Sequence, residues 1–158
     1  MKKHIVIAIT LLAIACRNSG GGETIPPFDF LLSDSTTRFN TAAIPQGSPI
    51  VLLYFSPDCE HCQHETETII HHMDSLKQVR FYFITNDPPD RIKVFSEVYK
   101  LDKYANITLG WDNQFFFPRH FKGAAPPYLV LYDKQKRMQG AFEGGLEASK
   151  MIEFVNKL

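Results

Sequence analysis

The sequence predicts an α/β fold in which a central mixed sheet is flanked by helices. Strand-like and helix-like segments alternate through the middle of the chain, and residues 50–55 form a continuous apolar run. A run without polar alternation is typical of a strand buried on both faces, as in a sheet covered by helices. The 158 residues are 44% hydrophobic and 22% charged, which indicates one globular domain. Because 17 basic residues balance 17 acidic ones, no electrostatic signal for a nucleic-acid partner is present.

Most of the expected elements carry apolar residues at strand or helix spacing, and many are bounded by Gly, Pro, Asn, Asp or Ser. Strands are expected at residues 28–32, 36–39, 50–55, 79–85, 107–111, 128–132 and 137–142. Helices are expected at residues 59–76, with Asp58 as N-cap, at 90–101 and 146–158, and as a short helix at 115–117 that ends near Pro118. The first two strands form an extra N-terminal β-hairpin, and antiparallel ends make the sheet mixed.

The first 15 residues are typical of an export signal. A short basic start precedes residues 5–15, in which only Thr10 is polar. This run is too short for a membrane-spanning helix, which needs about 20 residues. Its end, Ala13 to Cys16, resembles the bacterial lipoprotein cleavage site, where the cysteine becomes the first residue and carries the lipid. We therefore expect an exported protein that is anchored to a membrane through lipidated Cys16 and faces the periplasm or cell surface; a plain secretory signal is the alternative.

A polar, glycine-rich segment follows the expected signal. Residues 16–25 include Gly20, Gly21 and Gly22, and are expected to form a flexible tether with a reach of roughly 15 Å. Residues 26–158 then form the folded domain. If Cys16 carries a lipid, two of the three cysteines remain for that domain.

These two cysteines, Cys59 and Cys62, stand where a predicted strand gives way to a helix. The first turn of a helix offers unpaired N–H groups and the positive end of the helix dipole, both of which stabilise a sulfur anion at Cys59. The spacing lets Cys59 attack a partner disulfide and Cys62 resolve the mixed disulfide. His61 directly precedes Cys62, and a cationic or hydrogen-bonding imidazole there would favour the thiolate and so tune the pair, whereas Glu60 acts in the opposite direction. The sequence therefore predicts a thiol–disulfide oxidoreductase that needs no cofactor.

Three other interpretations of the cysteine pair are haem attachment, a zinc site and a structural disulfide. Haem attachment would need a histidine where Gln63 stands. A zinc site would need two further ligands, for which His64, His71, His72 and His120 are available. A purely structural disulfide over so short a loop would stabilise the fold little. A non-catalytic binding module or metal carrier remains the alternative function.

The strand at 50–55, the motif at Cys59 and Cys62 and the later Pro127 before an apolar strand resemble thioredoxin-fold proteins, specifically the exported TlpA/ResA-like thiol–disulfide oxidoreductases. The resemblance covers residues 26–158. It implies a thioredoxin-like fold, protein thiol and disulfide substrates, and a membrane or soluble redox partner. In that family a cis-proline faces the two cysteines and shapes the substrate groove, and Pro127 is the matching position.

The chain departs from the patterns of related proteins at several positions. Many thioredoxins carry a buried acid where this chain has Leu53, so Glu60, water or another base would have to move the proton. The residue before the cis-proline usually offers its N–H to substrate, whereas Pro126 has none. Peroxiredoxins, the closest enzymatic alternative, share the fold, but their motif needs a proline at the position of Leu52, although Ser56 matches its hydroxyl position.

Overall fold

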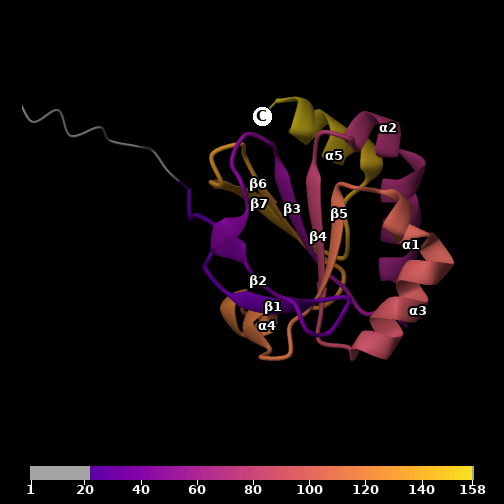
Figure 1. Ribbon diagram of the computed structural model, residues 1–158. Coiled ribbons are helices and arrows are strands. Elements are labelled where there is room, and N and C mark those ends of the chain that lie inside the picture. The colour runs from indigo at the N-terminus through magenta and orange to yellow at the C-terminus, as the bar shows by residue number, and fades with distance from the viewer. Residues whose placement is uncertain (1–21, 158) are drawn as a thin grey trace, which may run out of the picture.

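The computed structural model describes residues 22–157, in which seven strands form one mixed sheet with helices on both faces (Figure 1). The expected signal peptide, Cys16 and the first part of the expected tether lie outside these residues. The strands are β1 (Asp29–Leu32), β2 (Arg38–Asn40), β3 (Ile50–Tyr54), β4 (Arg80–Thr85), β5 (Ile107–Trp111), β6 (Tyr128–Tyr132) and β7 (Met138–Glu143). The helices are α1 (Glu60–His71), α2 (Met73–Leu76), α3 (Pro89–Tyr99), α4 (Phe116–His120) and α5 (Ala148–Asn156), with 3-10 helices η1 (Thr41–Ala43) and η2 (Leu101–Lys103).

Strand β3 lies inside the sheet, whose order is β2-β1-β5-β4-β3-β6-β7. It pairs in parallel with β4 and antiparallel with β6. Its side chains alternate between the two faces: Val51 and Leu53 pack under α1, α3 and α5, whereas Ile50 and Leu52 pack on the opposite side with α4. All four are at most 1% exposed. The predicted fold class is therefore confirmed, and so is the burial of this strand on both faces.

The predicted N-terminal hairpin is present and extends the sheet. β1 pairs antiparallel with β2 and, on its other side, antiparallel with β5. β2 is shorter than expected because Thr36 and Thr37, which were expected to begin the strand, belong to the preceding turn. Asp34 Oδ1 accepts hydrogen bonds from the backbone N–H groups of Thr36 and Thr37, at 2.9 and 2.7 Å. A short polar side chain that bonds the backbone two residues ahead is typical of such turns.

The expected single helix over residues 59–76 is broken in two. The backbone of His72 leaves the helical region, with φ −103° and ψ 17°, and α2 starts at the next residue. The ring nitrogen Nδ1 of His72 lies 3.0 Å from the carbonyl oxygen of Thr68. The prediction that Asp58 caps the first helix was also wrong. Cys59 is the N-cap, and its sulfur accepts the N–H of Cys62 at 3.3 Å.

Helix α4 does not end near Pro118, as expected, but continues to His120. Pro118 is the third residue of the helix, where a backbone N–H would have no partner inside the helix, so its ring is tolerated there. The buried carboxylate of Asp112 supplies the start signal by accepting the N–H of Phe117 at 2.7 Å.

The chain that leads into the domain lies along the edge strand β7. Thr24 forms an antiparallel bridge with Arg137, and Met138 donates its N–H to the carbonyl of Glu23 at 2.7 Å. Ile25 is 8% exposed and packs into the core on the α4 side of the sheet. The final residues of the expected tether are thus bound to the domain.

Gly110 lets the N-terminal hairpin join the sheet, because a Cβ at this position would overlap the ring of Phe30. Phe30 is 1% exposed and packs in the core on the α4 side of the sheet. We expect Gly110→Ala to destabilise the domain by about 1–3 kcal/mol, as other overpacking changes do. Urea denaturation measures this change. Gly140→Ala is the matched control, since its Cβ would only touch the edge of the half-exposed Phe142 ring; equal effects of both changes would contradict the expectation.

Candidate active site

The two cysteines stand at the carboxyl end of β3, where the chain turns into α1. Phe55, the residue after β3, donates its N–H to the carbonyl of Ile84 at 3.0 Å, which extends the sheet pairing by one residue. The turn that follows is closed by a hydrogen bond of 3.1 Å from the N–H of Cys59 to the carbonyl of Ser56. Cys59 therefore emerges beside the end of the sheet and directly at the start of a helix.

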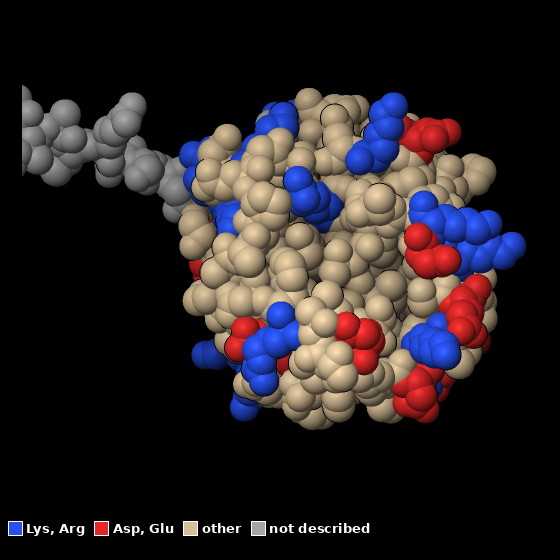
Figure 2. Space-filling model, in the orientation of Figure 1, with Lys and Arg blue, Asp and Glu red and all other residues tan. Residues whose placement is uncertain are grey.

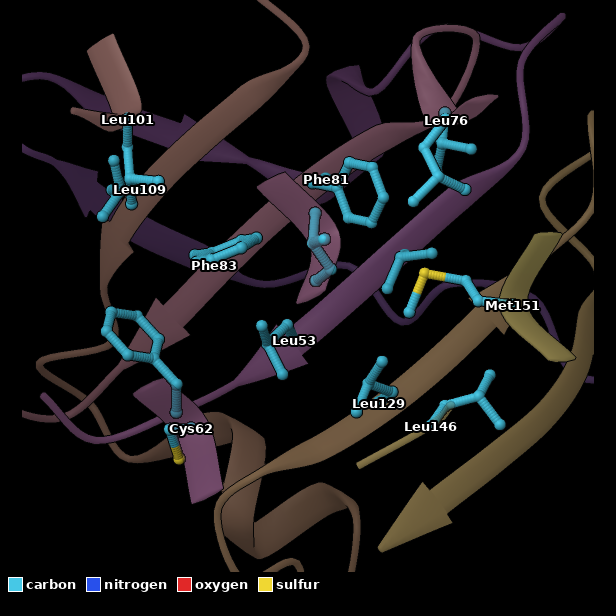
Figure 3. Packing of buried hydrophobic residues seen from close by; sticks show 14 of the residues in the cluster. Leu53, Cys62, Leu76, Phe81, Phe83, Leu101, Leu109, Leu129, Leu146 and Met151 are labelled. Atoms are coloured by element: carbon cyan, nitrogen blue, oxygen red, sulfur yellow. The ribbon is translucent and has the colours of Figure 1, made fainter. Parts of the chain in front are cut away.

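The two thiols differ in exposure. Cys59 is half-buried, whereas Cys62 is completely buried and packs among the core residues under α1 (Figure 3). Burial raises the pKa of the Cys62 thiol far above its ordinary value, and its hydrogen bond with Cys59 adds to the rise. One sulfur is thus open to a partner, and the other is held protonated behind it.

The loop before β6 brings a proline pair beside the accessible sulfur. The peptide bond between Pro126 and Pro127 is cis, at the position that the resemblance implied. The Cys59 thiol lies 3.6 Å from the carbonyl oxygen of Pro126, to which it can donate. This proximity follows from the sheet, because the pairing of Tyr54 with Tyr128 places the end of β3 next to the start of β6.

Glu65 is a site residue that sequence reasoning missed. It lies one helical turn after Cys62, is 6% exposed, and accepts the N–H of Leu146 on Oε2 at 3.1 Å. Its Oε1 has no hydrogen-bond partner among residues 22–157. Burial raises the pKa of Glu65 to about 7, and its charge contributes to the raised pKa of Cys62. The signal was the spacing of Cys62, Glu65 and Ile69, which places the acid on the buried face of the helix.

The turn before α5 makes room for this acid. Gly145 has a φ of +103°, and a Cβ there would lie 2.6 Å from Glu65 Oε2 and 3.9 Å from Pro127 Cγ. A cavity of about 210 Å³ opens at this point between α1 and the turn, lined by His64, Glu65, Thr68 and residues 144–147. The carboxyl group therefore lies beside the proline loop and next to a space that can hold water.

The described part of the chain contains neither a cluster of possible metal ligands nor a helix able to span a membrane. Within residues 22–157, no three His, Cys, Asp or Glu side chains are grouped to hold a metal ion. No helix in that range is long and apolar enough to cross a membrane. Figure 2 shows basic and acidic side chains interspersed on the visible face, without a large patch of one sign.

Comparison with known proteins identifies the fold. No protein-family model matches the sequence, and curated proteins give no significant match. Among solved structures, a secreted Mycobacterium tuberculosis disulfide oxidoreductase homologous to E. coli DsbE aligns over 83% of this chain and 96% of its own, with a TM-score of 0.69 and 19% identity. The chain has a thioredoxin-like fold.

Other structures with this thioredoxin-like fold carry different chemistries. Mycobacterium tuberculosis DsbF, in mixed oxidised and reduced forms, covers 82% of this chain and 93% of its own at 19% identity, with a TM-score of 0.69. The peroxidoxin BcpB from the same organism covers 87% and 97% at 15% identity, with a TM-score of 0.71. Since the fold is common to both chemistries, the reaction has to be argued from the site.

Within the thioredoxin-like fold, the structure brings three of the expected site residues together. Cys59, Cys62 and the Pro126–Pro127 pair meet at the end of β3. His61 instead lies exposed on α1, and in residues 22–157 its ring has no hydrogen-bond or ion-pair partner. Leu53, at the position of the thioredoxin acid, is fully buried under α1 with Cys62. Glu65, on α1, lies next to the same group of residues.

Protonation of Glu65 makes the stability of the thioredoxin-like domain depend on pH. The folded carboxyl holds its proton up to about pH 7, whereas the unfolded one releases it near 4.5. The folded state therefore binds more protons in this window, and the free energy of unfolding falls as pH rises through it. The full difference is about 3 kcal/mol.

Glu65→Gln should remove this pH dependence, which urea denaturation at pH 4.5, 6 and 7.5 measures. Glu67→Gln, on the exposed side of the same helix, is the control and should retain the wild-type slope. A slope between pH 4.5 and 7.5 that is equal in wild type and Glu65→Gln would show that Glu65 does not hold the proton.

Proposed function

We propose that this protein is an exported thiol–disulfide oxidoreductase that exchanges disulfides with protein substrates through Cys59 and Cys62. The observation that carries the proposal is the unequal exposure of two free thiols at one helix start. An accessible sulfur can reach a partner, and a buried sulfur in the next turn can then displace that partner. The Pro126 carbonyl beside Cys59 adds a main-chain contact on the side where a substrate would approach.

The proposed reaction needs only the groups at this site. The Cys59 thiolate attacks one sulfur of a substrate disulfide, the substrate S–S bond breaks, and the leaving sulfur takes up a proton. Cys62 then loses its proton and attacks Cys59, which releases the second substrate thiol. The substrate gains two electrons and two protons, and Cys59 and Cys62 become a disulfide. The reverse sequence oxidises a substrate dithiol.

The second step requires an acceptor for the Cys62 proton, and Glu65 fits this role. Its pKa of about 7 lets it take up and release a proton at neutral pH. It is one helical turn from Cys62 and borders the cavity through which water can exchange protons. Glu65 thus takes the part that the resemblance assigned to an acid at the position of Leu53. His61, exposed on α1, is assigned only an electrostatic influence on the pair.

The proposal includes location and partners. Residues 1–15 and Cys16 support a lipoprotein signal of an extracytoplasmic, membrane-anchored protein of the TlpA/ResA-like type, and the solved disulfide oxidoreductase described above is itself called secreted. Its partners would be protein thiols and disulfides and a separate redox protein that restores the cysteine pair.

Peroxide reduction is supported less well by the site. Leu52 occupies the position where the peroxiredoxin motif needs a proline, and it is buried beneath α4. The hydroxyl of Ser56, the other matching position, donates to Asp87 at 2.9 Å. Disulfide exchange requires neither of these motif positions, and so it accounts for the site more completely.

A test of the proposal separates the roles of the two cysteines. With dithiothreitol as reductant, the wild-type protein should accelerate the reduction of insulin disulfides. Cys59→Ser should reduce this rate at least about 100-fold, because the attacking sulfur is lost. Cys62→Ser should instead accumulate a mixed disulfide between Cys59 and substrate, detected by non-reducing electrophoresis and mass spectrometry. Wild-type activity in Cys59→Ser, or metal release on acidification with no reductase activity, would contradict the proposal.

Pro126 is expected to limit the binding of extended substrates, since it has no N–H to donate beside Cys59. Pro126→Thr should lower the KM for a disulfide-containing peptide about two- to tenfold, the range that one net hydrogen bond provides. Pro126→Ala is the matched variant because it restores the N–H without a hydroxyl, and it should give the same gain. An unchanged KM in both variants would exclude this limit on binding.

A further inference from the structure

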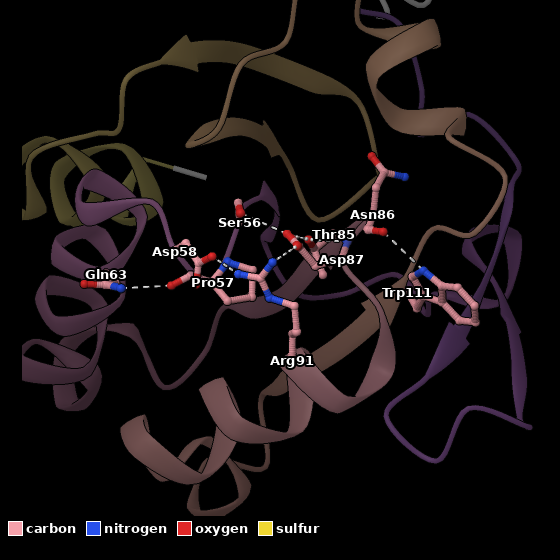
Figure 4. A network of polar contacts seen from close by, with 9 residues as sticks. All are labelled: Ser56, Pro57, Asp58, Gln63, Thr85, Asn86, Asp87, Arg91 and Trp111. Carbon is pink, nitrogen blue, oxygen red and sulfur yellow. Dashed lines mark hydrogen bonds and ion pairs between the residues drawn. The ribbon is translucent and has the colours of Figure 1, made fainter.

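A network of polar contacts holds the turn that precedes Cys59 (Figure 4). Arg91, in the first turn of α3, reaches across to this turn and forms ion pairs with two carboxylates. Its Nη1 lies 3.2 Å from Asp87 Oδ1, and its Nη2 pairs with Asp58 Oδ2. Asp58 is the residue directly before Cys59, so Arg91 binds the immediate sequence neighbour of the reactive cysteine.

Asp87 also binds the turn through its second carboxylate oxygen. Its Oδ2 accepts the hydroxyls of Ser56 and Thr85, at 2.9 and 3.2 Å. Gln63 holds the turn from the helix side by donating its side-chain amide to the carbonyl of Pro57 at 2.9 Å. The three residues before Cys59, namely Ser56, Pro57 and Asp58, are thus each held by a side chain from the loop before α3, from α1 or from α3.

The acidic residues on both sides of Cys59 indicate a second role for Arg91, that of a counter-charge. Asp58 precedes the cysteine and Glu60 follows it, and both carboxylates oppose a negative charge on the sulfur between them. Among residues 22–157, Arg91 is the one cation that forms an ion pair with Asp58. The Asp58 side chain is 78% exposed and that of Arg91 is 38% exposed. Ion pairs this exposed add little to stability, so stability alone gives no reason for this one.

We propose that Arg91 is a positioning residue for disulfide exchange, which offsets the charge of Asp58 and fastens the turn that presents Cys59. The proposal rests on the proposed function, because it assigns Arg91 a task in the reaction of that site. Arg91 itself touches neither the sulfur nor a substrate. It acts through Asp58 and Asp87, and its contribution should therefore be seen as a change in Cys59 reactivity at nearly constant stability.

The test measures the rate at which iodoacetamide alkylates Cys59 in the reduced full-length protein at pH 7, followed at the Cys59 peptide by mass spectrometry. At low ionic strength, Arg91→Met should slow alkylation by about three- to tenfold, because Asp58 loses its counter-charge. Arg91→Lys should keep most of the wild-type rate. At 1 M salt, where charges are screened within about 3 Å, the difference between Arg91→Met and wild type should fall below about twofold.

Two further variants test whether the slower alkylation is specific to the Arg91–Asp58 ion pair or follows from any loss of positive charge on α3. Lys93→Met removes one positive charge from the exposed side of the same helix, where Lys93 lies 4.0 Å from Glu97, and should alkylate at the wild-type rate. Asp58→Asn combined with Arg91→Met should return the rate close to wild type, because the side chain next to Cys59 then carries no charge. The melting temperatures of all variants are measured alongside.

A wild-type alkylation rate in Arg91→Met would overturn the proposal. So would a slow rate that neither salt, lysine nor Asp58→Asn relieves, since it would indicate a merely structural role. The insulin assay of the wild-type protein tests the proposed function separately. If Cys59 alkylation depends on Arg91 but insulin is not reduced, the proposed function fails while the influence of Arg91 on Cys59 stands.

Discussion

The candidate site depends on the two-sided pairing of β3. Because β3 is hydrogen-bonded to β4 and β6 and buried on both faces, its carboxyl end is a fixed point of the molecule. The chain leaves that point into α1 with Cys59 as the N-cap, and β6 starts beside it after the proline pair. The cysteines, prolines and Glu65, which are distant in sequence, meet because they are attached to neighbouring elements of this one strand pairing.

Much of the fold could be predicted from the sequence because local patterns and burial agree in the central strands and the hairpin. The predicted boundaries were wrong where a hydrogen bond from one side chain to a backbone N–H determines where an element starts or ends. Asp34 shortens β2, Cys59 replaces Asp58 as the helix cap, and Asp112 starts α4 early enough for Pro118 to fit within its first turn. Such contacts between a side chain and a nearby N–H depend on rotamers, which periodicity does not encode.

The cysteine pair and the proline position could be found from motif spacing, but the groups that surround them could not. Glu65 is buried only because the turn at Gly145, 80 positions later, closes over it, and Arg91 meets Asp58 across 33 positions. These contacts are products of tertiary packing. A helical pattern can show that Glu65 faces inward, but only the folded chain shows that Leu146 donates to it and that one of its oxygens lacks a partner.

The bridge between Thr24 and Arg137 fixes the point at which the chain enters the domain. That bridge is at the start of β7, next to Tyr132, whereas the cysteines lie near Tyr128 at the other end of β6. The attachment point and the reactive thiols are therefore separated by about one strand length, roughly 15–20 Å. The segment bound along β7 therefore enters the domain away from the reactive end of the sheet, and this contact leaves the side of Cys59 uncovered.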